Sequence, residues 1–245
     1  MPKKAQFHSV ADANAAPSGA ASVDKALSLL SAFRAGDASL TLAELAERSQ
    51  LYKSTVLRSL ASLAHAGYVQ RLPDGRYGLG SEIARLSAVY AASFSLDRIV
   101  LPVLQALVQH TGESAAYHVR QGGARLCLYR VDSPHPIRDH VRAGEVLPLY
   151  RGSGGRVLVA FDETLLTDVP AVDRALYQQI AAQGYYAATG DRLAEVAGIS
   201  APVFGRDKRI AGALTLTMPV HRYKEEYVAQ VIDAAADLST RLGGL

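Results

Sequence analysis

The hydrophobic pattern of residues 22–80 changes its period, and this change limits the fold more than any other feature of the sequence. Three successive segments repeat apolar residues every three to four positions, which is typical of amphipathic helices. They begin near Ser22, Thr41 and Tyr52. From residue 68 onward the period becomes two, as in a pair of strands. The order helix, helix, helix, hairpin predicts a winged helix-turn-helix.

Local signals mark the ends of these elements. Thr41 and Glu44 have the spacing of a capping box at a helix start. Gly67 ends the third helix, and Pro73-Asp74-Gly75 predicts the turn of the hairpin, because proline presets the first turn position and glycine accepts a positive φ. The apolar row of the third helix is predicted to be Val56, Leu57, Leu60, Leu63 and Ala64.

The polar side of the third predicted helix carries basic and hydroxyl residues but no acid. The second helix of a helix-turn-helix pair lies in the major groove, where its first turns meet phosphates and base edges. Arg58 suits a bidentate contact to guanine. Lys53, Ser54 and Thr55 suit phosphates near the helix N-terminus. Two arginines of the hairpin are predicted to reach the flanking backbone or the minor groove. The predicted DNA-binding residues are Lys53, Ser54, Thr55, Arg58, Ser59, Ser62, Arg71 and Arg76.

The net charge is concentrated in the same part of the chain. With 26 basic and 23 acidic side chains, the formal net charge is +3. Residues 52–80 contain four basic side chains and one acid, which accounts for the whole excess. Such clustering indicates a localised anionic partner, double-stranded DNA. A winged helix that binds another protein stays open as an alternative, and it predicts no salt-sensitive affinity for DNA.

The composition excludes several other classes. Hydrophobic residues make up 49% of the 245 residues, enough for a substantial core in one large or two ordinary domains. No run of eighteen apolar residues predicts a membrane span, and the N-terminal segment lacks the apolar stretch of a secretory signal. Cys127 is the only cysteine and cannot form an internal disulfide, so we expect a cytoplasmic protein. Residues 1–21 are expected to be a flexible tail.

The rest of the chain predicts a second domain over residues 95–245, joined to the first by a linker helix over residues 81–94. Hairpin strands are expected within residues 114–131 and 195–220. Helices precede, separate and follow these hairpins. This order favours an α+β arrangement in which helices cover an antiparallel sheet.

The glycine-rich segment RGSGGR at residues 151–156 is the main candidate for ligand binding. Small residues that lead into a helix let several backbone N–H groups converge on an anion. The lysine and hydroxyl of a phosphate-binding loop are missing, and Arg151 stands where a nucleophile elbow needs glycine. A plain flexible turn is the alternative.

Together these motifs resemble the IclR family of bacterial transcription regulators. The resemblance rests on KSTVLR at residues 53–58, on GYVQR and YGLG of the hairpin, and on GGRVLVAF, GISAPVFG and IAGALTLTMP further along. It covers about residues 22–243. It implies a winged-helix DNA-binding domain, a linker helix that dimerises, and a C-terminal GAF-like α/β effector domain. It also implies homodimers, or dimers of dimers, on palindromic operators near metabolic genes.

The resemblance also implies an effector site. It places Gly154 and Gly155 where backbone amides hold the carboxylate of a small metabolite. The effector-binding residues that it implies are Ser153, Gly154, Gly155, Asp191, Gly198, Thr215 and Thr217. From spacing alone, the two threonines indicate only that they share one face of a strand.

The chain departs from the family at several positions. Arg156 replaces the usual lysine, Arg151 replaces a small residue, and the stretch before Gly184 is shortened. Gln50 stands where the family often has glycine in the turn before the third helix. The arginines favour an acidic effector, a small organic acid with aromatic acids among the candidates. Four tyrosines either line such a site or belong to the core: Tyr117, Tyr129, Tyr150 and Tyr186.

An enzyme that processes a small molecule and carries an appended winged helix is the alternative of another class. It needs a catalytic pair, and the sequence offers only Cys127 with His118 on a neighbouring strand, without a third group to orient the histidine. The alternation around Cys127 indicates a core position. His135 and His140 lack the spacing of metal ligands on a helix. We therefore expect no catalytic residue, no metal and no cofactor.

Overall fold

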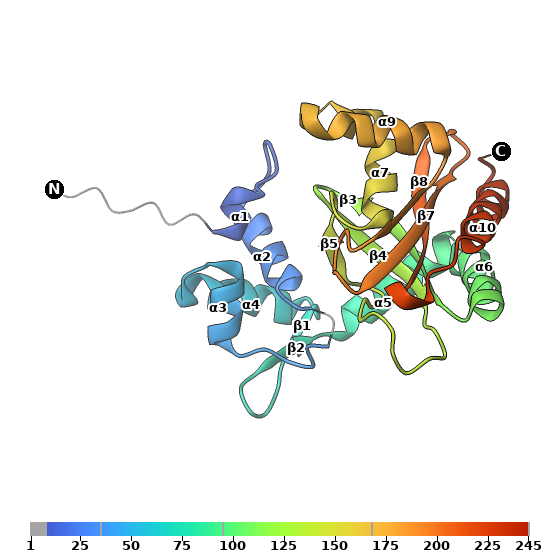
Figure 1. Cartoon of the computed structure of the whole chain (residues 1–245). Helices are drawn as coiled ribbons and strands as arrows, with labels where there is room; N and C mark the ends of the chain where they lie inside the picture. Colours follow the sequence, from blue (N-terminus) through green and yellow to red (C-terminus); the bar gives the residue numbers. More distant parts are fainter. Residues whose placement is uncertain (1–8, 35, 95, 168, 245) are drawn as a thin grey trace. The chain divides into compact units, whose positions relative to one another are not determined.

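The computed structural model describes residues 9–34, 36–94, 96–167 and 169–244. The chain divides into two compact units, residues 1–94 and 95–245 (Figure 1). Each unit has a hydrophobic core of its own. Of the helices that the structure describes, none combines the length and the apolar character needed to cross a membrane.

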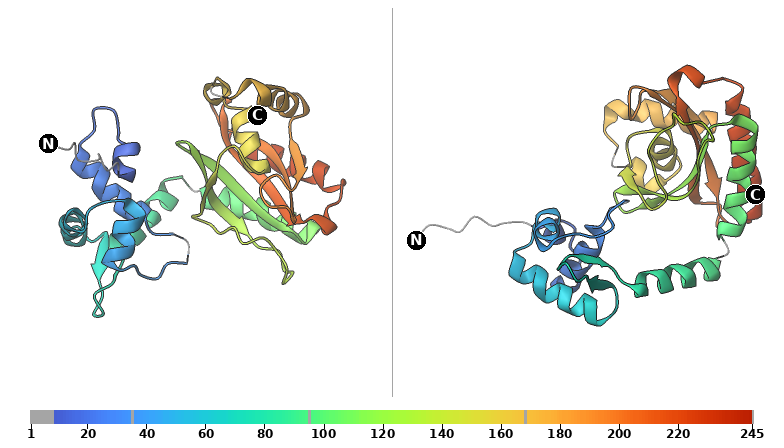
Figure 2. Two further views of the ribbon diagram at one scale, coloured as in Figure 1. Left: turned by 60° about the vertical axis from the view of Figure 1, so that its left-hand side comes forward. Right: turned by 90° about the horizontal axis from the view of Figure 1, so that it is seen from below.

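Short helices and a hairpin make up the first unit. Its elements are α1 (Val10–Ala13), α2 (Ala21–Ser31), α3 (Leu42–Ser49), α4 (Lys53–His65), β1 (Val69–Arg71), β2 (Tyr77–Leu79) and α5 (Ser81–Phe94). Helices α2, α3 and α4 with the β1–β2 hairpin form the predicted winged helix-turn-helix. The tip of the hairpin extends away from these helices (Figure 2). Helix α5 covers the predicted linker.

The local signals at the helix-turn-helix are confirmed. The Thr41 side chain accepts a hydrogen bond from the Glu44 amide at 3.2 Å, and the Glu44 carboxylate accepts one from the Thr41 amide at 2.7 Å. Between α3 and α4, Gln50 adopts the left-handed conformation with a φ of 53°. The turn thus keeps the geometry that glycine usually provides, at some conformational cost for a residue with a Cβ.

The predicted apolar row of α4 is partly wrong. Val56, Leu60 and Leu63 are buried in the core of the first unit. Leu57 is 46% exposed and Ala64 is exposed as well. Residues 56, 60 and 63 follow the spacing of four and three that one helix face requires, whereas each neighbour in sequence lies about 100° further around the helix.

The expectation of a flexible tail over residues 1–21 is wrong for part of its length. Residues 10–13 form α1, which packs against α2. Ser9 and Asp12 form a capping box, and Ala11 is buried. Residues 1–8 lie outside the described part. The sequence signal was the pair Ser9 and Asp12, which is a weak one in a segment rich in alanine.

The β1–β2 hairpin is the wing of the winged helix. A bridge between Tyr77 in β2 and Leu40, in the segment before α3, joins the wing to the helices of the first unit. In the hairpin, Val69 pairs with Leu79, and Gly75 in the turn has a φ of 81°, as the turn sequence predicts. Leu40 and Tyr77 exchange two backbone hydrogen bonds of 2.8 and 2.7 Å. This bridge fixes the hairpin against the segment that leads into α3.

An antiparallel sheet of six strands, in the order β5-β4-β3-β8-β7-β6, forms the centre of the second unit. Its strands are β3 (Ser114–Gln121), β4 (Ala124–Val131), β5 (Val146–Pro148), β6 (Tyr186–Thr189), β7 (Val196–Phe204) and β8 (Ile210–Pro219). Its helices are α6 (Leu96–Thr111), α7 (Ser153–Ala160), α8 (Glu163–Leu166), η1 (Ala171–Asp173), α9 (Arg174–Gln183), η2 (Val220–Arg222) and α10 (Tyr227–Arg241). The short edge strand β6 and the helix α8 were not predicted.

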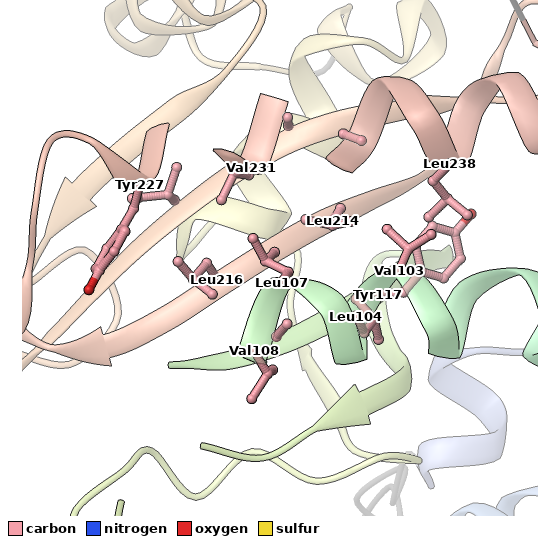
Figure 3. Packing of buried hydrophobic residues seen from close by; sticks show 14 of the residues in the cluster. Val103, Leu104, Leu107, Val108, Tyr117, Leu214, Leu216, Tyr227, Val231 and Leu238 are labelled. Atoms are coloured by element: carbon pink, nitrogen blue, oxygen red, sulfur yellow. The ribbon is translucent and has the colours of Figure 1, made fainter. Parts of the chain in front are cut away.

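The two faces of this sheet differ in character. On one face, α6 and α10 pack against apolar side chains such as Tyr117, Leu214 and Leu216 (Figure 3). On the other face, α7 and α9 form a smaller apolar cluster around Leu158 and Ile180. Because strand side chains alternate between faces, the neighbours of the apolar residues point toward α7.

Replacing Leu60 by alanine should lower the free energy of unfolding of the first unit by about 2–5 kcal/mol, because this side chain is only 2% exposed. The same substitution at Leu57 should change it by about 0.5 kcal/mol or less. Urea denaturation followed by circular dichroism compares the two variants. Equal losses at both positions would contradict the assignment of the core face of α4.

Candidate functional site

The exposed face of α4 carries the predicted DNA-binding side chains. Lys53, Ser54, Arg58 and Ser62 are exposed, whereas Thr55 and Ser59 are half-buried. Helix α4 has no acid in its first turn, where the helix dipole favours negative charge. This end of the helix is therefore left to attract an external anion such as a phosphate.

An apolar side chain lies on the same face. Leu57 is exposed beside Arg58, and Tyr52, the residue before the first turn of α4, is exposed too. Sequence reasoning missed Leu57 as a surface residue, since it was assigned to the core. In a major groove, an apolar side chain at such a position suits the methyl group of thymine.

The two arginines of the wing have different surroundings. Arg71 is exposed. Arg76 donates from Nε to the Ser39 hydroxyl and from Nη2 to the Ser39 carbonyl, both at 2.8 Å, and its guanidinium lies 3.4 Å from the Glu44 carboxylate. The prediction that Arg76 reaches toward DNA from the wing does not fit this geometry, because its donors already tie the wing to the start of α3.

A small cavity lies in the second unit, between the N-terminal turn of α7 and the polar face of the sheet. Its volume is about 30 Å³. Five of the residues that the resemblance implies line it: Ser153, Asp191, Gly198, Thr215 and Thr217. Thr215 and Thr217 share one face of β8, as their spacing predicts.

Gly154 and Gly155 do not line the cavity, but they allow its walls to approach. A Cβ on Gly154 would lie 2.7 Å from Thr215 Oγ1 and 2.9 Å from Arg125 Nη1. A Cβ on Gly155 would lie 2.1 Å from the Leu149 carbonyl oxygen. Any larger residue would push the first turn of α7 away from the sheet.

Hydroxyl groups connect α7 to strands β7 and β8 of the sheet. Ser200 Oγ lies 2.9 Å from Ser153 Oγ and 2.8 Å from Thr215 Oγ1. Thr215 Oγ1 also lies 3.2 Å from Nδ1 of His118. Burial lowers the pKa of His118 well below 6.5, and the positive charges of nearby arginines lower it further. The imidazole is therefore neutral at physiological pH.

Sequence reasoning missed the charged wall of the cavity. This wall consists of Arg125 and Arg130 on β4, Asp139 in the following loop and Arg192 after β6. Arg130 lies 2.7 Å from Asp132 and also pairs with Asp139, while Arg192 lies 3.6 Å from Asp139. The sequence signal for this wall was the presence of Arg125 and Arg130 in the otherwise mainly apolar strand RLCLYRV.

The Arg156 and Asp191 side chains lock the glycine-rich loop. Asp191 accepts a hydrogen bond from the Gly152 amide at 2.7 Å and pairs with Arg156 at 3.0 Å. Burial lowers the pKa of Arg156, but hydrogen bonds to Asp191 and Tyr177 outweigh that effect and raise it. Arg156 is thus compensated within the protein, and Arg151 is exposed outside the cavity lining. The basic character expected from these two arginines comes from the wall instead.

None of the four candidate tyrosines lines the cavity. Tyr117 is buried in the apolar core on the opposite face, and Tyr129 packs against that core. Tyr186 packs against the α7–α9 cluster, and Tyr150 is partly exposed. The core alternative therefore holds for Tyr117.

The Cys127–His118 pair is not an activated nucleophile. The two residues are register partners on β3 and β4, yet the thiol lies 3.8 Å from the Tyr129 carbonyl oxygen, to which it donates. Burial raises the pKa of Cys127 to about 11, so the thiol is protonated at neutral pH. Cys127 belongs to a small buried cluster with Ala116, Val141 and Leu147.

A winged helix with an exposed, acid-free α4 and a separate unit with a polar ligand cavity define a ligand-responsive DNA-binding regulator of transcription. A family model described as the IclR helix-turn-helix domain matches residues 22–73. A second, described as the bacterial transcriptional regulator IclR C-terminal domain, matches residues 88–168 and 162–241. The chain belongs to the IclR family of bacterial transcriptional regulators.

Individual relatives support this assignment over nearly the whole chain. The glycerol operon regulatory protein of Streptomyces griseus is 29% identical, with 91% of this chain and 96% of the relative covered. The transcriptional regulator KipR of Bacillus subtilis is 25% identical, with 90% and 96% covered.

Two solved structures share the fold. An IclR-type regulator from a Silicibacter species superimposes with a TM-score of 0.81 at 27% identity, covering 91% of this chain and 97% of the other. An IclR homologue from Microbacterium hydrocarbonoxydans, complexed with 4-hydroxybenzoate, gives a TM-score of 0.77 at 22% identity, with 90% and 98% covered.

Replacing Gly154 by alanine should destabilise the second unit by about 1–3 kcal/mol, because the new Cβ would lie 2.7 Å from Thr215 Oγ1. Gly123 is the matched control, since a Cβ there would meet nothing within 4 Å. Thermal denaturation of both variants measures the difference. A Gly154→Ala variant as stable as Gly123→Ala would show that α7 does not pack closely on the sheet.

The buried neutral His118 should make the second unit acid-sensitive. Below about pH 6.5 the unfolded chain binds a proton at this histidine that the folded chain excludes, so acid favours unfolding. Relative to His118→Gln, the wild type should lose up to about 1.4 kcal/mol of unfolding free energy per pH unit below this value. Urea denaturation of both proteins between pH 5 and 8 tests this. Parallel pH profiles would contradict a buried neutral imidazole.

Proposed function

We propose that this regulator binds palindromic operator DNA as a homo-oligomer through α4, and that a small carboxylate in the cavity beneath α7 changes its operator affinity. The observation that carries the proposal is the exposed face of α4. Lys53, Ser54 and Arg58 are exposed there, and residues 52–80 hold the excess positive charge of the chain.

The DNA-binding residues divide by role. Arg58 and Leu57 lie in the second turn of α4, where side chains meet base edges in the major groove. Lys53, Ser54 and Thr55 at its start would hold phosphates, with the positive end of the helix dipole behind them. Ser59 and Ser62 would add contacts further along the helix, and Arg71 would contact the backbone from the wing.

The described residues support oligomer formation through apolar side chains on helical surfaces. Leu86 and Val89 on α5 are exposed and stand three residues apart, so they share one face of the helix. Val23 and Leu27 on α2 are exposed in the same way. Two-fold symmetry of the protein would be matched by a palindromic operator.

The effector would be an organic acid that binds among the cavity residues Ser153, Asp191, Gly198, Thr215 and Thr217, beside the α7 turn of Gly154 and Gly155. The relative that holds 4-hydroxybenzoate supports an acid. The acid must bind one arrangement of the oligomer better than another, since only a difference in affinity can shift an equilibrium. The shift would alter the spacing of two DNA-binding units.

The protein would act in the cytoplasm and without catalysis. An enzyme with an appended winged helix would need a catalytic pair, and in the candidate pair of Cys127 and His118 the thiol is protonated. A winged helix that binds only protein would leave the acid-free face of α4 without a reason.

Replacing Arg58 by alanine should relax the sequence preference and weaken operator binding by about 1–3 kcal/mol, because Arg58 would read a base. Arg71→Ala is the matched control: a phosphate contact should weaken binding to all sequences alike and reduce the salt dependence by about one charge. Fluorescence anisotropy on DNA from the upstream intergenic region and on scrambled DNA separates these effects. If neither variant lost affinity, or if the wild type did not prefer its own DNA, the assignment of α4 would be wrong.

A further inference from the structure

We infer that Arg125 binds the carboxylate of the effector directly, and that the effector carries a hydroxyl or keto oxygen next to that carboxylate. The inference rests on the proposed function of the cavity as the effector site. It adds a charged anchor on β4 to the amide and hydroxyl groups that the family resemblance implies.

Arg125 is a buried cation without a counter-ion in the protein. Only 3% of the residue is exposed, and it lines the cavity. Its Nε donates to the Pro148 carbonyl oxygen at 3.2 Å, which holds the guanidinium in one orientation. Among the residues that the structure describes, no carboxylate lies within ion-pair distance of it. A buried charge without a partner is costly, so Arg125 favours an anionic ligand in the cavity.

The surroundings of Arg125 increase that cost. Burial and the positive charge of Arg192 together lower its pKa to about 10, although the charges of Asp191 and Asp139 act in the opposite direction. The first turn of α7 also faces the guanidinium: a Cβ on Gly152 would lie 2.8 Å from Nη2, and one on Gly154 would lie 2.9 Å from Nη1. A helix N-terminus carries partial positive charge. The guanidinium and the start of α7 border the same cavity, so both would attract an anion bound there.

The neighbouring arginines show that this situation is specific to Arg125. Arg130 is paired with Asp132 and Asp139, and Arg156 is paired with Asp191. Arg192 lies 3.6 Å from the Asp139 carboxylate. Each of them would lose an internal partner if it turned toward a ligand. Arg125 has no such ion pair among the described residues, so binding of a ligand carboxylate to Arg125 would break no ion pair within the protein.

Three polar atoms of side chains that line the cavity are buried without a hydrogen bond, and one of them, Oδ2 of Asp139, lies 3.6 Å from the guanidinium of Arg192. The other two are Nε2 of His118 and Oγ1 of Thr217, and the His118 residue is only 2% exposed. They come from β3 and β8, adjacent strands that cross the floor of the cavity. A second oxygen on the ligand can satisfy them, whereas an apolar group would leave them buried and unpaired. The cavity of about 30 Å³ also favours a compact acid.

Titration calorimetry of the full-length protein tests both parts of the inference, with lactate and propionate as probes that differ by one hydroxyl. We expect lactate to bind at least tenfold more tightly than propionate, and sodium chloride at equal ionic strength to give no binding. Equal affinities for lactate and propionate would contradict the inference that the effector carries a second oxygen next to its carboxylate. Binding of 4-hydroxybenzoate in preference to lactate would contradict the inference that the effector is a compact acid. Binding of neither lactate nor propionate would contradict it as well.

Two methionine variants test the anchor. Arg125→Met removes an uncompensated charge, so it should raise the midpoint of thermal unfolding of the free protein while abolishing lactate binding. Arg156→Met leaves Asp191 without its partner, so it should lower that midpoint. Arg125→Lys keeps a charge and should retain weakened binding. If Arg125→Met lowered the midpoint, or bound lactate as the wild type does, Arg125 would not be the anchor.

Operator binding by the same preparations separates this inference from the proposed function. Specific DNA binding without any response to lactate overturns the inference and leaves the regulator intact. Lactate binding by a protein with no preference for its own upstream DNA supports the inference for the cavity and contradicts the proposed role of α4.

Discussion

The second unit depends on the close contact between the first turn of α7 and the six-stranded sheet. Only glycine fits at residues 154 and 155, because a Cβ there would lie 2.7 Å from a threonine hydroxyl or 2.1 Å from a backbone carbonyl. The contact brings the start of a helix onto polar side chains of β3, β7 and β8. The opposite face of the same sheet is apolar and packs against α6 and α10 (Figure 3). One sheet thus provides a core on one face and a binding cavity on the other.

In the function that we propose, the first and the second unit both bind their ligands through positive charge that has no internal partner. On α4, positive groups stand exposed without acids near the helix start, and water solvates them until a phosphate replaces it. Beneath α7, Arg125 is buried, so water cannot compensate it to the same degree. Arg76 and Arg156 show the contrast, since each is held by a carboxylate of its own unit and stabilises a loop or wing. We therefore infer that Arg125 is available to a ligand because the fold leaves it without an ion-pair partner among the described residues, whereas Arg76 and Arg156 bind neighbouring carboxylates.

Short-range signals made much of the fold predictable. The capping box of Thr41 and Glu44, the Pro73-Asp74-Gly75 turn and the alternation of β3, β4, β7 and β8 are all local. The error at Leu57 arose because a helix period cannot by itself assign residues at the edge of the buried face. Cavity residues such as Thr215 and Ser153 followed from family resemblance. The charged wall did not, because Arg125, Asp139 and Arg192 come together only through sheet order and loop packing, which residue spacing does not reveal. The hydrogen bonds of Arg76 to Ser39 were not predicted either, because the two residues are 37 positions apart and meet only in the folded unit.

Coupling between acid binding and DNA binding is the central claim, and one titration tests it directly. Operator DNA is titrated with the protein by fluorescence anisotropy at constant ionic strength, with and without a saturating concentration of the acid that binds most tightly in calorimetry. We predict that the acid changes operator affinity by about 5–150-fold, the usual range of allosteric coupling, and that DNA changes acid affinity by the same factor. An acid that binds the cavity tightly and leaves operator affinity unchanged would contradict the account.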